Sequence, residues 1–262
     1  MTFYSHSKEE DDGNILGSKE LRAHILGVKE KALFHLAENV TLGFSKEELK
    51  ALIELTADLH DLGKYTSYFQ NYLLKKEPIN QKLKQHASIG AFTAFNLLKK
   101  EEKKARLVFY LIFLHHSSLI DFSELSAKLG LDVEDVINHQ QENLKPTAKI
   151  LQEELGIPDL FRNIFYSNER DIRKGFRKWK IKEATIQDYF LINYLFSLLI
   201  EADKLDASDT RVYFLKSIHP SSVDDRFGLP KLLPSKSLKE LNNNELRNYC
   251  RAVVGATLEE PN

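Results

Sequence analysis

Apolar residues recur at the spacing of one helix face along most of this chain, and this pattern limits the possible fold most strongly. Long examples occur at 49–59, 105–114 and 186–205. The chain has 262 residues but only 11 glycines and 7 prolines, so few positions interrupt helices. A helical period with few breaks predicts an almost wholly helical chain. Because the length suffices for one sizeable core, we expect an all-α helical bundle.

Polar residues at the ends of these apolar runs predict where helices begin. Ser18 is expected to cap a helix that follows the turn-forming residues 11–14. Ser45 and Glu48 form a capping box at the start of the next helix. The run at 105–114 is apolar almost all round, which predicts a buried helix.

The second half of the chain is expected to be more varied. Residues 121–155 read as shorter, more exposed helices broken at Gly130 and Pro146. Residues 186–205 predict a long apolar helix, with Phe190 on its apolar side. We expect one domain over 1–262, with its core at about 15–210 and residues 211–262 as a covering segment.

Composition excludes several classes of protein. The chain is 42% apolar and 29% charged, which is ordinary for a globular protein, and its net charge is −1. No apolar run reaches the ~18–20 residues that a membrane span needs, and the N-terminus has no signal-peptide pattern. Cys250 is the only cysteine, which excludes an internal disulfide and a cysteine-rich zinc site. We therefore expect a cytoplasmic protein without a membrane partner.

The sequence His60-Asp61-Leu62-Gly63-Lys64 follows the helix predicted at 49–59. An imidazole beside a carboxylate offers a metal ion two ligands from one turn. Lys64 lies at i+3 from Asp61 and i+4 from His60, so its ammonium could contact a phosphate bound to such a metal. Alone, the dipeptide is equally consistent with a polar pair on a helix surface.

Further histidines and acids lie at predicted helix ends or beside predicted buried faces. An unpaired buried carboxylate is costly, and metal coordination would explain the whole set at once. The candidate ligands are His24, His60, Asp61, His86, His115, His116 and Asp203.

Imidazole and carboxylate ligands suit Mn²⁺, Fe²⁺, Co²⁺, Ni²⁺ or Zn²⁺, whereas Mg²⁺ prefers oxygen ligands. Seven ligands are too many for one ion with an open coordination position, which indicates two ions sharing a carboxylate. Two-metal sites suit phosphodiester cleavage.

These residues resemble the HD superfamily of metal-dependent phosphohydrolases. More closely, they resemble the HD nuclease domain of the Cas-three family of type I CRISPR systems. The resemblance spans about residues 1–210 and lies in the segments 4–7, 60–64, 84–88, 115–117 and 202–208. It implies an HD-domain helical bundle with its metal site at the centre of the helices.

The resemblance also implies roles for the candidate ligands. His24, His60, Asp61 and Asp203 would hold one ion, and Asp61 would bridge to a second. The second ion would be held by His86, His115 and His116, while Lys64 would neutralise charge on the reacting phosphate. The cofactors expected are two divalent transition-metal ions, namely Mn, Ni, Co or Fe.

Five other residues stay outside the expected ligand set. His6 stands where the family commonly has a lysine, and Asp206 receives no role. His35, His139 and His219 match nothing in the family and are expected on the surface.

Family members usually carry a helicase after the HD domain, but no P-loop motif occurs in these residues. The chain is therefore expected to be a separate HD subunit or one cut before the helicase. The implied partners are single-stranded DNA, a helicase subunit or domain, and the CRISPR RNA-guided surveillance complex.

A basic segment at 162–182 has two interpretations. Its cations could track a phosphate backbone while its aromatics stack on unpaired bases; alternatively, it is a solvated amphipathic helix with inward-facing aromatics. The candidate nucleic-acid-binding residues are Arg173, Lys174, Arg177, Lys178 and Trp179.

The leading functional hypothesis is a metal-dependent endo- or exonuclease that degrades invader DNA exposed as a single strand in an R-loop. An HD phosphohydrolase acting on nucleotides or cyclic nucleotides is the alternative enzyme. A non-catalytic binding module is the third hypothesis, but such a module need not keep seven candidate ligands.

Overall fold

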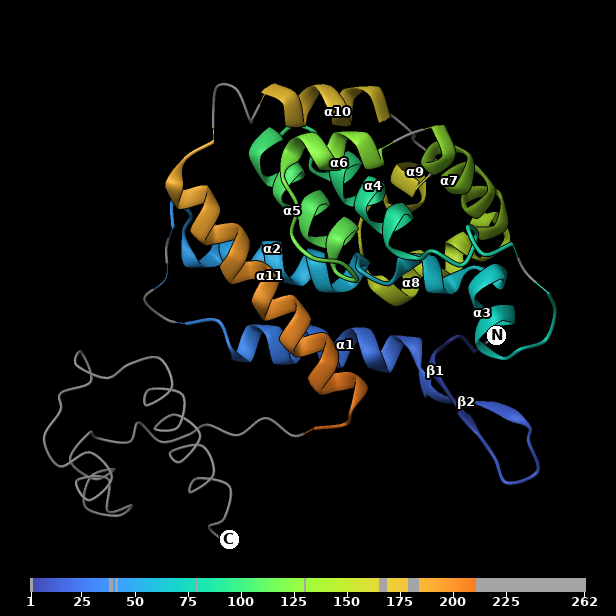
Figure 1. Cartoon of the computed structure of the whole chain (residues 1–262). Helices are drawn as coiled ribbons and strands as arrows, with labels where there is room; N and C mark the ends of the chain where they lie inside the picture. Colours follow the sequence, from blue (N-terminus) through green and yellow to red (C-terminus); the bar gives the residue numbers. More distant parts are fainter. Residues whose placement is uncertain are drawn as a thin grey trace, which may run out of the picture. The chain divides into compact units, whose positions relative to one another are not determined.

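The computed structural model of the chain describes residues 2–37, 40, 42–78, 80–129, 131–164, 169–178 and 184–210 (Figure 1). Contacts within the chain divide it into two units, Met1–Arg211 and Val212–Asn262. All described residues belong to the first unit. The expected covering segment at 211–262, with His219, lies outside the described residues.

The described residues are mostly helical, which confirms the predicted all-α class. The helices are α1 Leu21–Phe34, α2 Lys46–Leu59, α3 Ser67–Leu73, α4 Ala87–Leu97, α5 Glu102–Leu114, α6 Phe122–Lys128, α7 Leu131–Leu144, α8 Ala148–Leu155, α9 Leu160–Ile164, α10 Glu169–Lys178 and α11 Ile186–Ala207. Short 3-10 turns lie at η1 Leu62–Tyr65 and η2 Lys145–Thr147. The strands are β1 Tyr4–Glu9 and β2 Ile15–Glu20.

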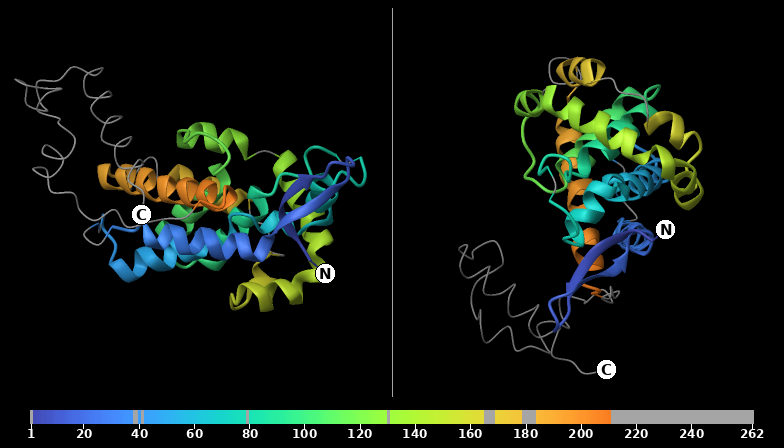
Figure 2. Two further views of the ribbon diagram at one scale, coloured as in Figure 1. Left: turned by 90° about the horizontal axis from the view of Figure 1, so that it is seen from below. Right: turned by 90° about the vertical axis from the view of Figure 1, so that its right-hand side faces the viewer.

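An antiparallel hairpin precedes the first helix, so the predicted helix cap at Ser18 is wrong. Ser18 lies within β2, and α1 begins at Leu21 without a side-chain cap. The backbone N–H of Leu21 instead donates to the carbonyl oxygen of Phe3, at 2.8 Å. A hydrogen bond to a residue earlier in the same chain thus satisfies a backbone group that a local cap would otherwise serve. The hairpin lies at the N-terminal end of α1, beside the bundle (Figure 2).

The sequence marked the hairpin turn but not the strands around it. Gly13 adopts φ +81°, a conformation that glycine reaches without steric cost, so the turn predicted at 11–14 is confirmed. Most residues of β1 and half of those of β2 are polar, which hides the alternation typical of a half-buried strand.

Helices α1, α2, α4, α5 and α11 pack around a common core (Figure 1). Every residue from Ala105 to Ile112 is buried, which confirms the predicted buried helix, although α5 begins earlier, at Glu102. Helix α4 lies along α5, while α1 contacts both α2 and α11. The ends of these helices converge on one region, which positions the candidate ligands.

Helix α11 confirms the long helix expected at 186–205, with one correction. Leu191, Leu195 and Leu199 are buried, but Phe190 is 55% exposed and does not belong to the buried side. No helix among the described residues is both long and apolar enough to cross a membrane.

Candidate metal centre

The His60-Asp61 pair lies where α2 gives way to a tight 3-10 turn. The capping box of Ser45 and Glu48 starts α2 as predicted, and His60 is its C-cap. Asp61 then begins η1, in which Lys64 N donates to Asp61 O at 2.9 Å. This change of direction aims both side chains into the bundle, where His60 and Asp61 are almost fully buried.

Gly63 allows the loop before α4 to approach this turn. A Cβ at Gly63 would lie 2.5 Å from the Cα of His86, which is too close for any side chain. The backbone N–H of Gly63 donates to the carbonyl oxygen of His86 at 3.2 Å. Gly63 thus lets His86 lie next to the pair formed by His60 and Asp61.

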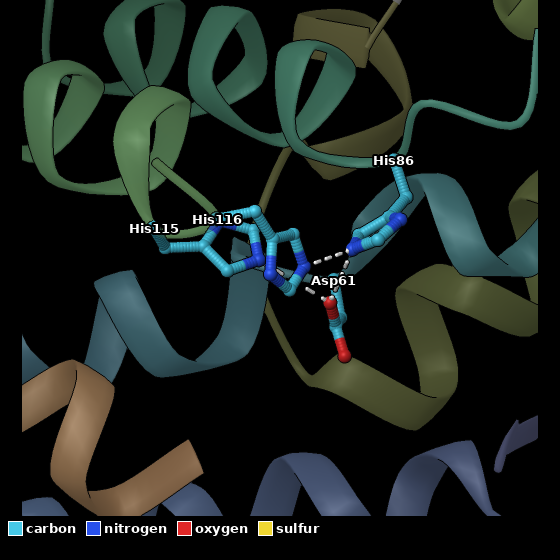
Figure 3. Close-up of side chains that lie close together, drawn as sticks. All are labelled: Asp61, His86, His115 and His116. Atoms are coloured by element: carbon cyan, nitrogen blue, oxygen red, sulfur yellow. Dashed lines mark hydrogen bonds and ion pairs between the residues drawn. The ribbon is translucent and has the colours of Figure 1, made fainter. Parts of the chain in front are cut away.

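Three further histidines occupy the ends of α4 and α5. His86 is the N-cap of α4, His115 is the C-cap of α5, and His116 follows it. Figure 3 shows their rings turned toward Asp61. Together with Asp61 they form one of two groups among the described residues that could hold a metal ion, with one ligand atom from each residue within 4.8 Å of the others.

The second group consists of His24, His60 and Asp61. His24 Nε2 lies 3.2 Å from Asp61 Oδ2, and His60 Nε2 lies 3.4 Å from the same oxygen. Asp203, from the last turns of α11, places Oδ1 3.2 Å from His24 Nε2. The structure thus brings together all seven predicted ligands, and Asp61 belongs to both groups.

Backbone contacts fix how two of the rings are protonated. The Nδ1 atoms of His60 and His115 each lie 2.7 Å from a main-chain carbonyl oxygen, Ala57 O and Ile112 O respectively. A carbonyl can only accept, so Nδ1 carries the hydrogen and Nε2 keeps its lone pair for a ligand. A second hydrogen bond of this kind is usual for histidines that bind metals.

The residues present fit a bound cation. Within the described residues, the buried Nε2 atoms of His24, His60 and His115 and the buried Oδ1 of Asp61 have no hydrogen-bond partner. Such unpaired buried atoms are costly, and four of them in one place indicate a missing partner common to all. A metal ion would supply that partner.

The electrostatics of the centre lead to the same conclusion. Burial lowers the pKa of His60 and of His116 to about 4, so both rings are neutral ligands at physiological pH. Burial also lowers the pKa of His24, but the carboxylates of Asp203, Asp206 and Asp61, each within 3.2 Å of a ring nitrogen, outweigh burial and raise the pKa to about 10. The carboxylates thus attract positive charge to this point, which a metal ion would provide in place of a proton.

Lys64 lies beside the shared carboxylate, as its spacing predicts. Its Nζ is 2.7 Å from Asp61 Oδ2, and the residue is only 7% exposed. Burial raises the pKa of Asp61, but the electrostatic environment set by His60, Lys64, His115 and His24 outweighs burial and holds the pKa well below its usual value.

Asp206 is a neighbour of the site that sequence reasoning left without a role. Its Oδ2 accepts a hydrogen bond from Nδ1 of His24 at 2.7 Å, and Lys19 and Lys31 form ion pairs with it at 2.9 and 2.8 Å. The available signal was its position three residues after Asp203, on the same side of one helix. His6 also lies near, with its ring centre 5.2 Å from that of His24.

Four of the five predicted nucleic-acid-binding residues lie elsewhere, on α10, which crosses the bundle beyond α5 and α6 (Figure 1). Lys174, Arg177 and Lys178 are exposed, and Lys178 Nζ lies 3.2 Å from Glu102 Oε2. Phe176 is fully buried and therefore cannot stack on a base. Trp179 lies outside the described residues, so nucleic-acid binding by this segment stays a prediction.

The structure describes two of the three histidines that were expected on the surface, His35 and His139. His139 is exposed, as expected. His35 is only partly at the surface, because it is half-buried and its Nε2 is buried without a hydrogen-bond partner in the described part of the chain. His35 is the C-cap of α1, and its ring centre lies 5.3 Å from that of Phe34.

The family profile described as "Cas3, HD domain" matches residues 9–160. A curated relative from Pyrococcus furiosus, named "CRISPR-associated endonuclease Cas3-HD", is 25% identical over 137 residues, which cover 48% of this chain. The aligned part spans 57% of the relative's length. No solved structure matches the chain. The profile match extends over more than half of the chain and includes the His-Asp turn and the paired histidines, so the chain belongs to the Cas3 HD-domain family.

Proposed function

We propose that this protein is a metal-dependent nuclease that cleaves the phosphodiester bonds of single-stranded DNA. The observation that carries the proposal is the meeting of two ligand groups at the single carboxylate of Asp61. When bound, two divalent ions supply a hydroxide at neutral pH and stabilise charge on the attacking and leaving oxygens. That chemistry is what hydrolysis of a phosphodiester requires.

The ligand roles follow the two groups. His24, His60, Asp61 and Asp203 would hold one ion, and His86, His115, His116 and Asp61 would hold the other. The hydrogen bonds from Nδ1 of His60 and His115 keep Nε2 directed inward before any ion arrives. Because the ligands come from five helix ends and helix faces, the packed bundle itself holds their geometry.

Lys64 would act on the substrate rather than on the ions. Its buried ammonium is held 2.7 Å from Asp61 Oδ2 by the 3-10 turn. A fixed positive charge there would offset the negative charge that develops on the phosphoryl oxygens during attack. It would need no reorganisation as the reaction proceeds.

We further propose a role in type I CRISPR interference. The relative's name, "CRISPR-associated endonuclease Cas3-HD", supports a nuclease in such a system. The substrate would be the DNA strand exposed in an R-loop, and the partners a helicase subunit or domain and the RNA-guided surveillance complex. Cleavage would take place in the cytoplasm.

Metal analysis of the purified protein, combined with incubation on labelled substrates, tests the proposal. The substrates are single-stranded DNA, duplex DNA, RNA, and nucleotides including cyclic ones, each with Mn²⁺, Ni²⁺, Co²⁺, Fe²⁺ or Mg²⁺ after chelator treatment. We expect up to two ions per chain and cleavage of single-stranded DNA in preference to the duplex.

Other outcomes would replace the proposal with a named alternative. Hydrolysis of nucleotides or cyclic nucleotides without cleavage of DNA would identify a nucleotide phosphohydrolase. Metal binding without hydrolysis of any of these substrates would favour a binding module instead.

A further inference from the structure

An open groove begins at the second ligand group and runs away from it. Its volume is about 640 Å³, and it is bounded by α3, the loop before α4, the end of α5, and parts of α6 and α7. Two candidate ligands, His86 and His116, belong to its lining. His116 is exposed, and the side chain of His86 is 14% exposed, so the groove reaches the metal centre from solvent.

The described lysine, arginine, aspartate and glutamate residues that line this groove are all cations. Lys82, Lys84 and Lys128 line it, and none of its lining residues, all in the described part of the chain, is an aspartate or a glutamate. Lys82 and Lys128 are exposed, and Lys84 is half-buried. A polyanion approaching the metals along this path would meet these cations, which favours phosphate groups.

The groove also has aromatic surface. Tyr72 is 44% exposed, and Nζ of Lys84 lies 3.9 Å from the centre of its ring. Phe69 is nearly buried and packs edge-on against both Tyr72 and His86, with ring centres 6.2 and 5.1 Å apart. Phe69 therefore fixes an exposed ring at a constant position relative to a candidate metal ligand.

These features together match the requirements of an unpaired polynucleotide. Bases that are not paired stack on exposed aromatic rings, while lysines follow the backbone phosphates. A duplex keeps its bases stacked on one another and could use only the lysines. Helix α10 differs, because its one described aromatic residue, Phe176, is buried.

We propose that this groove binds the single-stranded DNA segment that adjoins the scissile phosphate on the His86–His116 side. A base would stack on Tyr72, and the neighbouring phosphates would contact Lys84 and Lys128. The inference rests on the proposed nuclease function, since it assigns the substrate path of the same site.

Binding measured without metal tests the groove separately from catalysis. Chelator-treated full chain is titrated into a fluorescent single-stranded oligonucleotide, and Kd is followed by anisotropy at several salt concentrations. Tyr72→Ala should weaken binding about 5- to 150-fold, whereas Tyr72→Phe should bind nearly as the wild type does, since stacking needs only the ring. Tyr189→Ala is the matched control, because Tyr189 is also exposed, at 60%, but lies on α11 away from the groove.

The lysines are tested by the salt dependence. Lys84→Gln with Lys128→Gln should reduce the slope of log K against log salt by about 1.4, since each lost phosphate contact on a single strand removes about 0.7. The pair Lys50→Gln with Lys100→Gln removes equal charge from exposed positions outside the groove and should leave the slope unchanged.

The outcomes separate the groove from the nuclease function. If the wild type cleaves single-stranded DNA but the groove variants bind and cleave like their controls, the groove is not the path and the function stands. If no metal restores cleavage, the function fails, yet groove-dependent binding of the oligonucleotide would uphold the site. Competition by a mononucleotide as strong as by the oligonucleotide would overturn the proposal in favour of a nucleotide pocket.

Discussion

Nδ1 of His24 donates a hydrogen bond to Oδ2 of Asp206 at 2.7 Å, across 182 residues of sequence. The bond joins α1 to the last turn of α11. Lys19 and Lys31 hold the same carboxylate from two sides. A Cβ at Gly27 would lie 2.0 Å from Asp206 Oδ1, so only glycine leaves room for this contact. Asp206 thus orients His24 and directs its Nε2 toward Asp61.

Replacing Asp206 should weaken metal binding without removing a ligand. We expect Asp206→Ala to lower the affinity of the His24 group about 10- to 100-fold, the usual effect of losing a residue that orients a histidine ligand. Asp206→Asn, which keeps an oxygen acceptor, should lose less. Competition with a chelating dye measures the affinity. Asp209→Asn is the control, because Asp209 also pairs with Lys19 but is exposed. Unchanged affinity in Asp206→Ala would show that His24 needs no such support.

Replacing Asp61 should affect both ions, whereas replacing His116 should affect one. Asp61 belongs to both ligand groups, and His116 belongs only to the group with His86 and His115. Elemental analysis of folded Asp61→Ala should show metal lost from both positions, with cleavage abolished. His116→Ala should keep about one ion per chain and lose most activity. Normal metal content in Asp61→Ala would refute the shared carboxylate.

Replacing Lys64 should lower the rate while the ions stay bound. A charge partner of the transition state is not a ligand, so Lys64→Ala should keep the wild-type metal content and lose about 100-fold in kcat. The ion pair with Asp61 makes a stability control necessary, which a thermal melt of the loaded protein supplies. Lys75→Ala removes a well exposed lysine and should change neither quantity. A loss of metal in Lys64→Ala would instead assign Lys64 to the support of Asp61.

Substituting Gly90 should destabilise the helix contact behind the site. A Cβ at Gly90 would lie 1.9 Å from the carbonyl oxygen of Leu59, so α4 could not keep its approach to the end of α2. We expect Gly90→Ala to lower the free energy of unfolding by about 1–3 kcal/mol or more, measured by urea denaturation. Gly175→Ala is the matched change on α10, where the nearest atom would be 3.6 Å away. It should stabilise the protein by about 0.5–1 kcal/mol, and equal effects at both positions would contradict the packing argument.

Later transition metals should stabilise the protein more than Mg²⁺. An ion that binds only the folded state at 100 times its Kd adds about 2.7 kcal/mol of stability. Imidazole-rich groups bind Mn²⁺, Co²⁺ and Ni²⁺ better than Mg²⁺, so the melting temperature of chelator-treated protein should rise more with those ions. Single-stranded DNA cleavage should follow the same order. An equal shift and full cleavage with Mg²⁺ alone would contradict an imidazole-rich centre.

Local patterns in the sequence determined the helices and the chemistry of the candidate ligands. The apolar periods predicted α2, α5 and α11, and the capping box of Ser45 and Glu48 set the start of α2. Periodicity and capping depend on residues within a few positions of one another, which is why they can be read directly. The placement of histidines and acids at the ends of apolar runs likewise predicted which residues meet.

Only the tertiary structure decided how those residues meet and what surrounds them. The polar strands of the hairpin form through pairing between β1 and β2, and Phe190 faces outward because of how α11 lies on α1. Asp206 reaches His24, and the groove forms beside His86, through helix packing between distant segments. The sequence by itself therefore determined the class of fold and the set of candidate ligands. The family resemblance implied a division of those ligands into two groups around Asp61, but helix packing decided their distances and their surroundings, because contacts between residues far apart in the chain leave no periodic trace in it.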